Sequence, residues 1–90
     1  MTIYFEDNLT KENAVGRRVR ATEIYEAGIY GRAIIGVLQR DERGYSIDPE
    51  KINWGKRAIA FGALELYANE PRPIRLGSET TMISEEKDAA

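Results

Sequence analysis

The pattern of apolar and polar positions is clearest over residues 33–48. An aliphatic run fills the first half of this segment, the polar residues Asp41–Gly44 follow, and Tyr45 and Ile47 then alternate with polar residues. Two apolar segments joined by a short polar turn that ends in glycine are typical of a β-hairpin. We therefore expect a hairpin here, with Gly44 in a backbone conformation that other residues adopt only at a cost.

The glycines are spread through the rest of the chain, which favours a sheet with tight turns over a bundle of long helices. Residues 16–21 alternate as a short strand, and residues 23–31, rich in tyrosine and glycine, read as a loop. The strand that contains Ile35 and Val37 is expected to face a single core with both of these side chains. The aromatic residues outside the loops are expected in the core or at its edge: Tyr4, Phe5, Tyr45, Phe61 and Tyr67.

Residues 48–68 allow two interpretations. Asp48-Pro49-Glu50-Lys51 is typical of a turn or of the first turn of a helix. In the segment 56–67 alternate positions are apolar, as in a strand, yet Ile59, Ala63 and Leu66 also form a helical stripe. Gly55 and Gly62 favour the strand. We thus predict a mostly β fold, and the alternative is an α+β fold with a helix over 48–68.

The C-terminal part contains two breaks. Pro71 and Pro73 prevent a helix from passing into residues 74–76, and residues 80–83 fit either a strand or the start of a tail. Residues 84–90 are acidic and read as a disordered tail. The chain is therefore predicted to form one small globular domain over residues 1–83.

Composition excludes several kinds of chemistry. The 90 residues contain no cysteine and no histidine, which removes disulfides, thiolate catalysis, serine and cysteine triads and nearly all zinc sites. We expect no enzyme activity, no cofactor and no metal. Glu6 and Asp7 stand where a signal peptide would be apolar, and no apolar run is long enough for a membrane span, so a cytoplasmic protein is expected. The net charge is −2, with bases in excess only in the middle of the chain.

The segment VGRRVR, residues 15–20, resembles the first strand of SH3-like small β-barrels, in which a glycine precedes an alternating basic and apolar strand. The order of Tyr45, Ile47, Glu50-Lys51 and Asn53-Trp54 is similar to that in the stromal E subunit of photosystem I, a docking element for ferredoxin. The resemblance covers residues 15–70.

The S subunit of the photosynthetic NDH complex is similar in a second set of residues. These are Asn53-Trp54, the apolar segment Ile59–Leu64 and the pair Glu65-Leu66. The resemblance implies a small barrel or half-barrel with a short helical turn. Asp48-Pro49 departs from the continuous strand of these families.

Aromatic residues next to glycines and bases point to a binding surface. Tyrosine, tryptophan and arginine supply rigid contact area together with a polar group, and they dominate protein-binding hot spots. We predict a protein-binding module, an adaptor, docking subunit or inhibitor, that contacts a larger protein partner through five neighbouring residues: Tyr25, Tyr30, Arg32, Trp54 and Arg57. Arg32 and Arg57 would bind carboxylates of the partner.

Two other functions stay open. One is a homo-oligomer that binds a small ligand, and the sequence does not define the oligomeric state. The other is weak nucleic-acid binding through Arg17, Arg18, Arg20, Lys56 and Arg57 with Trp54 as a stacking platform, which the net negative charge disfavours.

Overall fold

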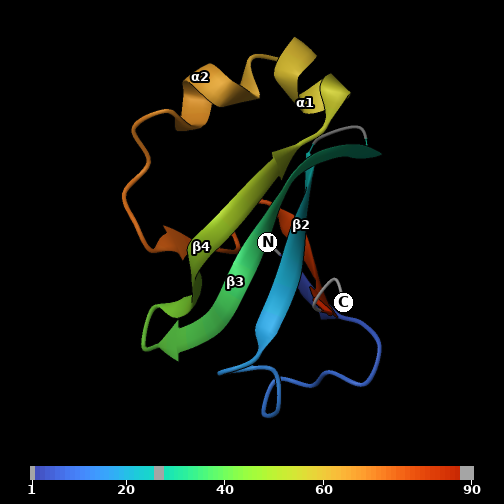
Figure 1. Ribbon diagram of the computed structural model, residues 1–90, viewed down its shortest axis with the longest axis vertical. Coiled ribbons are helices and arrows are strands. Elements are labelled where there is room, and N and C mark those ends of the chain that lie inside the picture. The colour runs from blue at the N-terminus through green and yellow to red at the C-terminus, as the bar shows by residue number, and fades with distance from the viewer. Residues whose placement is uncertain (1, 26–27, 88–90) are drawn as a thin grey trace.

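Six strands form one open sheet in the computed structural model, which describes residues 2–25 and 28–87 (Figure 1). The strand order is β1-β6-β2-β3-β4-β5, with β1 parallel to β6 and the other pairs antiparallel. The mostly β class is confirmed. The strands are β1 (Ile3–Phe5), β2 (Arg18–Tyr25), β3 (Ile29–Asp41), β4 (Gly44–Trp54), β5 (Ile74–Arg75) and β6 (Thr80–Glu85), and two short helices, α1 (Lys56–Ala60) and α2 (Ala63–Tyr67), lie at one end of the sheet (Figure 1).

The predicted hairpin is confirmed as β3 and β4. Asp41 pairs with Gly44, and Gly44 has a φ of 124°, a conformation that favours glycine. The Asp41 carboxylate accepts hydrogen bonds from both terminal nitrogens of Arg75, at 2.8 and 2.5 Å, and from the Arg43 N–H at 2.8 Å. These contacts hold the pKa of Asp41 below its usual value, with the Arg75 guanidinium as the largest cause. The turn and the short strand β5 are thereby joined.

The loop expected over residues 23–31 is wrong. Strand β2 continues to Tyr25 and β3 begins at Ile29, with Ile24 opposite Tyr30. These β-branched and aromatic residues pair across the two strands, which is the arrangement that such side chains favour. The connection is therefore much shorter than predicted. Glu26 and Ala27 lie outside the described residues.

The turn or helix start expected at Asp48–Lys51 is also wrong, because these residues continue β4. Pro49 lies opposite Gly36, next to a break in register between Ile35 and Gly36. On its other side β4 pairs with β5 only at Ser46 and Ile47. Pro49 thus lies in a stretch of β4 that β5 does not cover, where a missing N–H breaks no ladder on that side.

The segment 56–67 is helical, so the expected strand is wrong. The alternative of a helix over 48–68 holds only for its second half, as the two five-residue helices α1 and α2. Gly62 separates them with a φ of 75°, a left-handed conformation that ends the first helix and starts the second in a new direction. Gly62 had indicated a strand, but in the fold it serves as a helix boundary.

The folded part of the chain extends beyond the predicted domain end. Of the two alternatives for residues 80–83, the strand is the one present, as β6, which continues through Ser84 and Glu85. Glu86 then accepts hydrogen bonds from Arg20 at 3.1 and 3.2 Å. Ser84 and Glu85 therefore belong to the sheet, and Glu86 is held against β2 by Arg20. Residues 88–90 of the expected tail lie outside the described residues.

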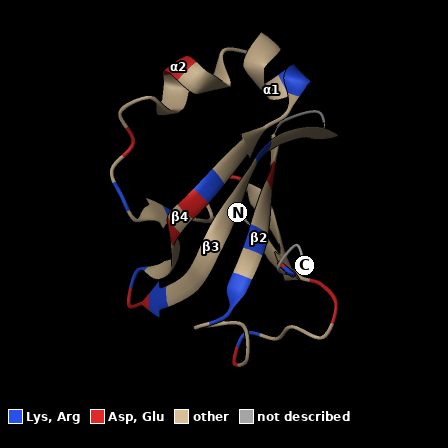
Figure 2. Cartoon of the chain, in the orientation of Figure 1, with Lys and Arg blue, Asp and Glu red and all other residues tan. Residues whose placement is uncertain are grey.

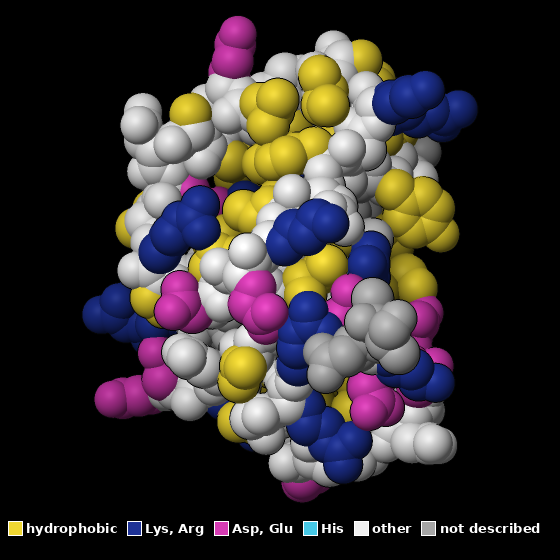
Figure 3. Space-filling view, in the orientation of Figure 1, with side chains coloured by type: hydrophobic (Ala, Val, Ile, Leu, Met, Phe, Trp, Pro, Cys, Tyr) yellow, Lys and Arg dark blue, Asp and Glu magenta, His cyan; other side chains and the backbone are white. Residues whose placement is uncertain are grey.

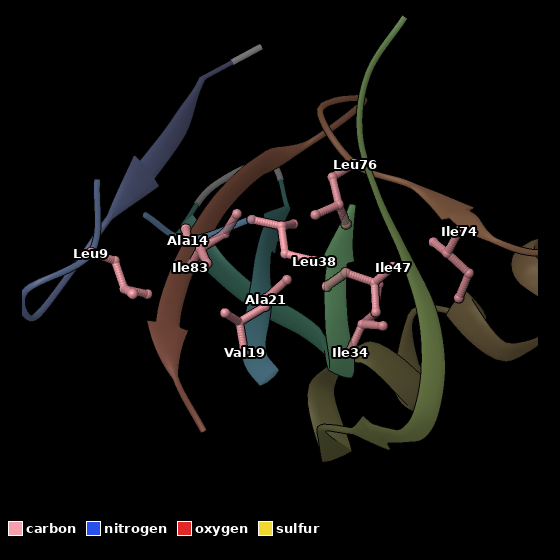
Figure 4. Close-up of a cluster of buried hydrophobic side chains, with 10 residues drawn as sticks. All are labelled: Leu9, Ala14, Val19, Ala21, Ile34, Leu38, Ile47, Ile74, Leu76 and Ile83. Carbon is pink, nitrogen blue, oxygen red and sulfur yellow. The ribbon is translucent and has the colours of Figure 1, made fainter. Parts of the chain in front are cut away.

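The core lies on the concave side of the curved sheet (Figure 4). Phe5 of β1 and Tyr45 of β4 touch edge to face with ring centroids 5.7 Å apart, although three strands lie between theirs. Both are partly buried against the core, as expected. Among the described strands no hydrogen-bonded ladder joins β1 to β5, so the sheet is curved but open. The buried cluster comprises Leu9, Ala14, Val19, Ala21, Ile34, Leu38, Ile47, Ile74, Leu76 and Ile83 (Figure 4).

The expectation for Ile35 and Val37 is corrected by this arrangement. Ile35 is buried, but it follows Ile34 in the strand and therefore points to the opposite face of the sheet, outside the core cluster. Val37 is 42% exposed. Phe61 and Tyr4 are exposed as well, so neither belongs to the core.

We predict that Ile34→Ala lowers the free energy of unfolding by about 2–5 kcal/mol, the range for a large-to-small change at a buried site. The matched variant Val37→Ala lies on the same strand at an exposed position and should change it by about 0.5 kcal/mol or less. Urea titration of both variants measures these values. Equal losses in the two variants would contradict the assigned facing of β3.

Candidate functional site

The structure divides the five predicted binding residues into two places. Trp54 of β4 lies directly opposite Arg32 of β3, and Tyr25 reaches the same group through the ring of Tyr67. Tyr30 and Arg57 instead line a separate hollow. The five residues therefore do not form one continuous contact surface.

Arg32 is the centre of the first place, and it is buried. Its side chain is only 1% exposed, and its Nε donates a hydrogen bond to Oε1 of Glu23 at 2.5 Å. Its Nη2 donates to Oε2 of Glu70 at 2.8 Å, and its Nη1 donates to Oε1 of the same carboxylate. Both carboxylates are thus supplied by the chain itself. Arg32 has no exposed surface with which to bind a partner's carboxylate, contrary to the role expected for it.

Aromatic rings cover the faces of this ion cluster. The Cζ atom of Arg32 lies 3.9 Å from the centroid of the Tyr67 ring and 5.7 Å from that of Trp54. The Tyr25 and Tyr67 rings stack at 6.4 Å. A side chain at Gly31 would overlap the Tyr25 ring, since a Cβ there would lie 2.3 Å from its Cζ. We call Glu23, Arg32, Trp54, Tyr67 and Glu70 the arginine cluster.

Burial shifts the protonation of these groups. Removal from water raises the pKa of the Glu23 carboxyl, against the opposing effect of Arg32. Burial also disfavours the charged form of Arg32, but its hydrogen bonds to Glu70 and Glu23 outweigh this and raise its pKa. Arg32 is therefore a permanent cation between two carboxylates, and burial raises the pKa of Tyr25 and Tyr67 as well.

The arginine cluster joins parts of the chain that are far apart in sequence. Its members come from β2, β3, β4, α2 and the segment that follows α2. A cavity of about 240 Å³ lies beside it, lined by Ile52, Leu64 and Arg72 together with members of the cluster. Within the described residues no group of three or more carboxylates is arranged to hold a metal ion. The contacts of the cluster link α2 and the segment after it to strands β2 and β3.

The helix pair above the cluster has an inverted pattern of burial. Its small residues Ala58 and Ala63 are buried, whereas the large apolar residues are exposed. Phe61 is 70% exposed and Leu66 is 76% exposed. We call the four exposed residues the apolar face: Ile59, Phe61, Leu64 and Leu66. The sequence did not predict the apolar face, because a helical stripe that contains Ile59 and Leu66 suggests that both are buried. The alternation of alanines with larger apolar residues was the one signal for it.

Most bases of the sheet are paired with acids. Nη1 of Arg17 lies 3.9 Å from Oε1 of Glu85. Nε of Arg18 lies 3.0 Å from Oε2 of Glu50, and Nε of Arg20 lies 3.1 Å from Oε1 of Glu86. Lys56 and Arg57, the other bases expected to contact nucleic acid, are exposed at α1, at the helical end of the molecule (Figure 2). The five bases thus do not form one cationic surface.

Comparison with known proteins identifies no relative: no family model matches the chain, and no curated protein or solved structure matches it significantly. The resemblance to SH3-like barrels stays a prediction. None of the helices in the described parts of the chain is long and apolar enough to cross a membrane.

We predict that Arg32→Met lowers the free energy of unfolding by about 3–5 kcal/mol, because it leaves the Glu23 carboxylate buried without a cation. Arg18→Met, which removes a partly exposed ion pair, is the control and should lose less than about 1 kcal/mol. The double variant Arg32→Met/Glu23→Gln should regain part of the loss. Urea titration measures all three; a double variant no more stable than Arg32→Met would contradict the role assigned to the buried charge.

A second prediction concerns pH. Because burial raises the pKa of Glu23 above its ordinary value of 4.5, the folded protein binds this proton more tightly than the unfolded chain. The contribution of the protonated Glu23 to the free energy of unfolding is fully present below pH 4.5. It is lost as the pH rises through the pKa of Glu23 in the folded state. The free energy of unfolding of Glu23→Gln, relative to the natural chain, should therefore increase as the pH rises from 4.5 toward neutral.

Urea titrations of both chains across this range measure the difference. Arg75 lowers the pKa of Asp41, and Arg20 lowers that of Glu86, so protonation of these two carboxylates at acid pH lowers the free energy of unfolding. Both chains contain the two residues, and this effect therefore cancels in the difference. A constant difference across the range would contradict the raised pKa of Glu23.

Proposed function

We propose that the protein is a small protein-binding module whose contact surface is the apolar face of α1 and α2. The observation that carries this proposal is the inverted burial of the helix pair: Ala58 and Ala63 are buried, whereas the large side chains of the apolar face are exposed. Figure 3 shows hydrophobic side chains gathered over the two helices at the top of the view, while charged side chains cover the strands below.

The free energy available at this face supports a partner. Full burial of a leucine, isoleucine or phenylalanine side chain contributes about 1.5–3 kcal/mol, and here four of them remain 44–76% exposed. Single exposed apolar residues are ordinary, but a contiguous group is typical of an interaction site. A partner that covers Phe61 and Leu66, the most exposed of the four, would gain the free energy of burying these two side chains.

The arginine cluster makes the face rigid. Tyr67 at the end of α2 and Glu70 beyond it are held by Arg32, whose own strand is central in the sheet. A surface that is already in its bound arrangement loses less entropy on association. In this proposal Arg32, Trp54 and Tyr25 support the contact surface from below, and Tyr30 and Arg57 lie at its rim.

The remaining sequence-based expectations complete the proposal. The module works in the cytoplasm as an adaptor, docking subunit or inhibitor, without a catalytic centre or cofactor, and its curved sheet is a half-barrel of the SH3-like kind. The ion pairs of Arg17, Arg18 and Arg20 disfavour nucleic-acid binding, because phosphates would compete with the chain's own carboxylates. The 240 Å³ cavity leaves ligand binding by a homo-oligomer as a second candidate.

Affinity capture with the double variant Phe61→Ser/Leu66→Ser tests the proposal. Both side chains are exposed, so the variant should keep its stability to within about 1 kcal/mol. Quantitative mass spectrometry should show a protein that the natural chain retains and the variant does not. Calorimetric titration of that purified protein should then show a loss of about 30-fold or more in affinity, the level of a hot spot.

Tyr4→Ser is the matched control, since Tyr4 is 54% exposed but lies on β1, away from the helices. It should retain the same protein as the natural chain. Retention by both the double variant and the control would contradict the proposal. A dimer mass by light scattering that becomes monomeric in the double variant would assign the face to a second copy of the chain instead.

A further inference from the structure

A hollow of about 340 Å³ opens beside the apolar face. It is lined by Gly28, Tyr30, Gly55, Lys56 and Arg57. Gly28 and Gly55 contribute no side chains, and the Tyr30 ring is 62% exposed. Lys56 and Arg57 begin α1, so the hollow adjoins the helix that carries Ile59. We call it the cationic hollow.

The two cations here, like Arg40 and Lys51 of the sheet, form no salt bridge within the described residues, unlike five of the arginines. Within the described parts of the chain, five arginines have a carboxylate within 4 Å, but neither Lys56 nor Arg57 has one: the paired residues are Arg17, Arg18, Arg20, Arg32 and Arg75. Two exposed cations next to an apolar surface produce a local positive potential on a chain whose net charge is −2. The charge that complements this end of the molecule is negative.

We infer that the partner presents an acidic and apolar segment, whose carboxylates bind Lys56 and Arg57 in the cationic hollow while its large apolar side chains cover Phe61, Leu64 and Leu66. This inference rests on the proposed function and adds the chemistry of the partner. Arginine binds a carboxylate through two parallel hydrogen bonds, which fixes the direction of the segment as well as adding affinity. The Tyr30 ring supplies an apolar wall with a hydroxyl donor at the edge of the hollow.

A lipid surface would also meet cations and apolar side chains, but it fits less well. Each base near an anionic bilayer contributes only about 1 kcal/mol, and this surface has two. Glu65 belongs to the same short helix as Leu64 and Leu66, and its carboxylate would repel an anionic headgroup. The five-residue helices also differ from the long amphipathic helices that lie in membranes. A protein segment with separated acids avoids Glu65 and reaches Lys56 and Arg57.

Selection from a phage-displayed library of random 12-residue peptides on the immobilised full chain tests the inference. The enriched peptides should contain aspartate or glutamate next to leucine, isoleucine, phenylalanine or tryptophan. Fluorescence anisotropy of the most enriched synthetic peptide should then show about tenfold weaker binding to Lys56→Glu/Arg57→Glu. Replacement of the peptide's acids by glutamine should weaken its binding to the natural chain by a similar factor.

The control is Lys11→Glu/Arg43→Glu, which changes the net charge equally at two exposed bases outside the site, and it should bind as the natural chain does. Enriched peptides without acids, or equal losses in both double variants, would overturn the inference while the proposed function stands. No enrichment, or binding that Phe61→Ser/Leu66→Ser leaves unchanged, would overturn the proposed function itself. Co-sedimentation of the natural chain with phosphatidylserine-rich vesicles would overturn the choice of a protein segment.

Discussion

The placement of the helices on the sheet depends on one buried cation. Arg32 lies in a central strand with its guanidinium between Glu23 of the neighbouring strand and Glu70 beyond α2. Tyr67 covers one face of the guanidinium, and Trp54 lies nearby. A buried guanidinium must satisfy its donors within the protein, so the chain can place its helix pair only where Glu70 and Tyr67 reach Arg32.

This constraint explains why the helices bury so little of their own apolar surface. Five-residue helices have little intrinsic stability in water, and α1 and α2 rely on tertiary contacts to persist. Tyr67 of α2 contacts Trp54 of the sheet, and Ala58 and Ala63 are buried, whereas the larger side chains of the two helices remain exposed. The same interaction that fixes the helices therefore leaves the apolar face open, and an electrostatic cluster takes the place of a hydrophobic contact beneath it.

The sequence could predict the local features. The β3–β4 hairpin follows from an aliphatic run, a polar turn and a glycine with positive φ, all within sixteen residues. The strand at Thr80–Ile83 and the mostly β class are likewise local consequences of composition and alternation. Of the predicted contact residues, Tyr30 and Arg57 are exposed beside one hollow. Residues 56–67 fit both the alternation of a strand and the stripe of a helix. The local sequence does not distinguish the two, because alanine and glycine are acceptable at these positions in either element.

Tertiary structure decided what those local signals could not. Arg32 is an ordinary surface residue in the sequence, and only the pairing of β2 with β3 and the return of the chain after α2 surround it with two carboxylates. The same holds for Pro49, which is compatible with a strand only because β5 ends before reaching it. The sequence by itself determined the β3–β4 hairpin and its turn, since hydrophobic alternation and glycine conformation act between neighbours. Which charges are buried, and which apolar side chains remain in water, was decided by contacts between residues as far apart as Glu23 and Glu70, which no local pattern contains.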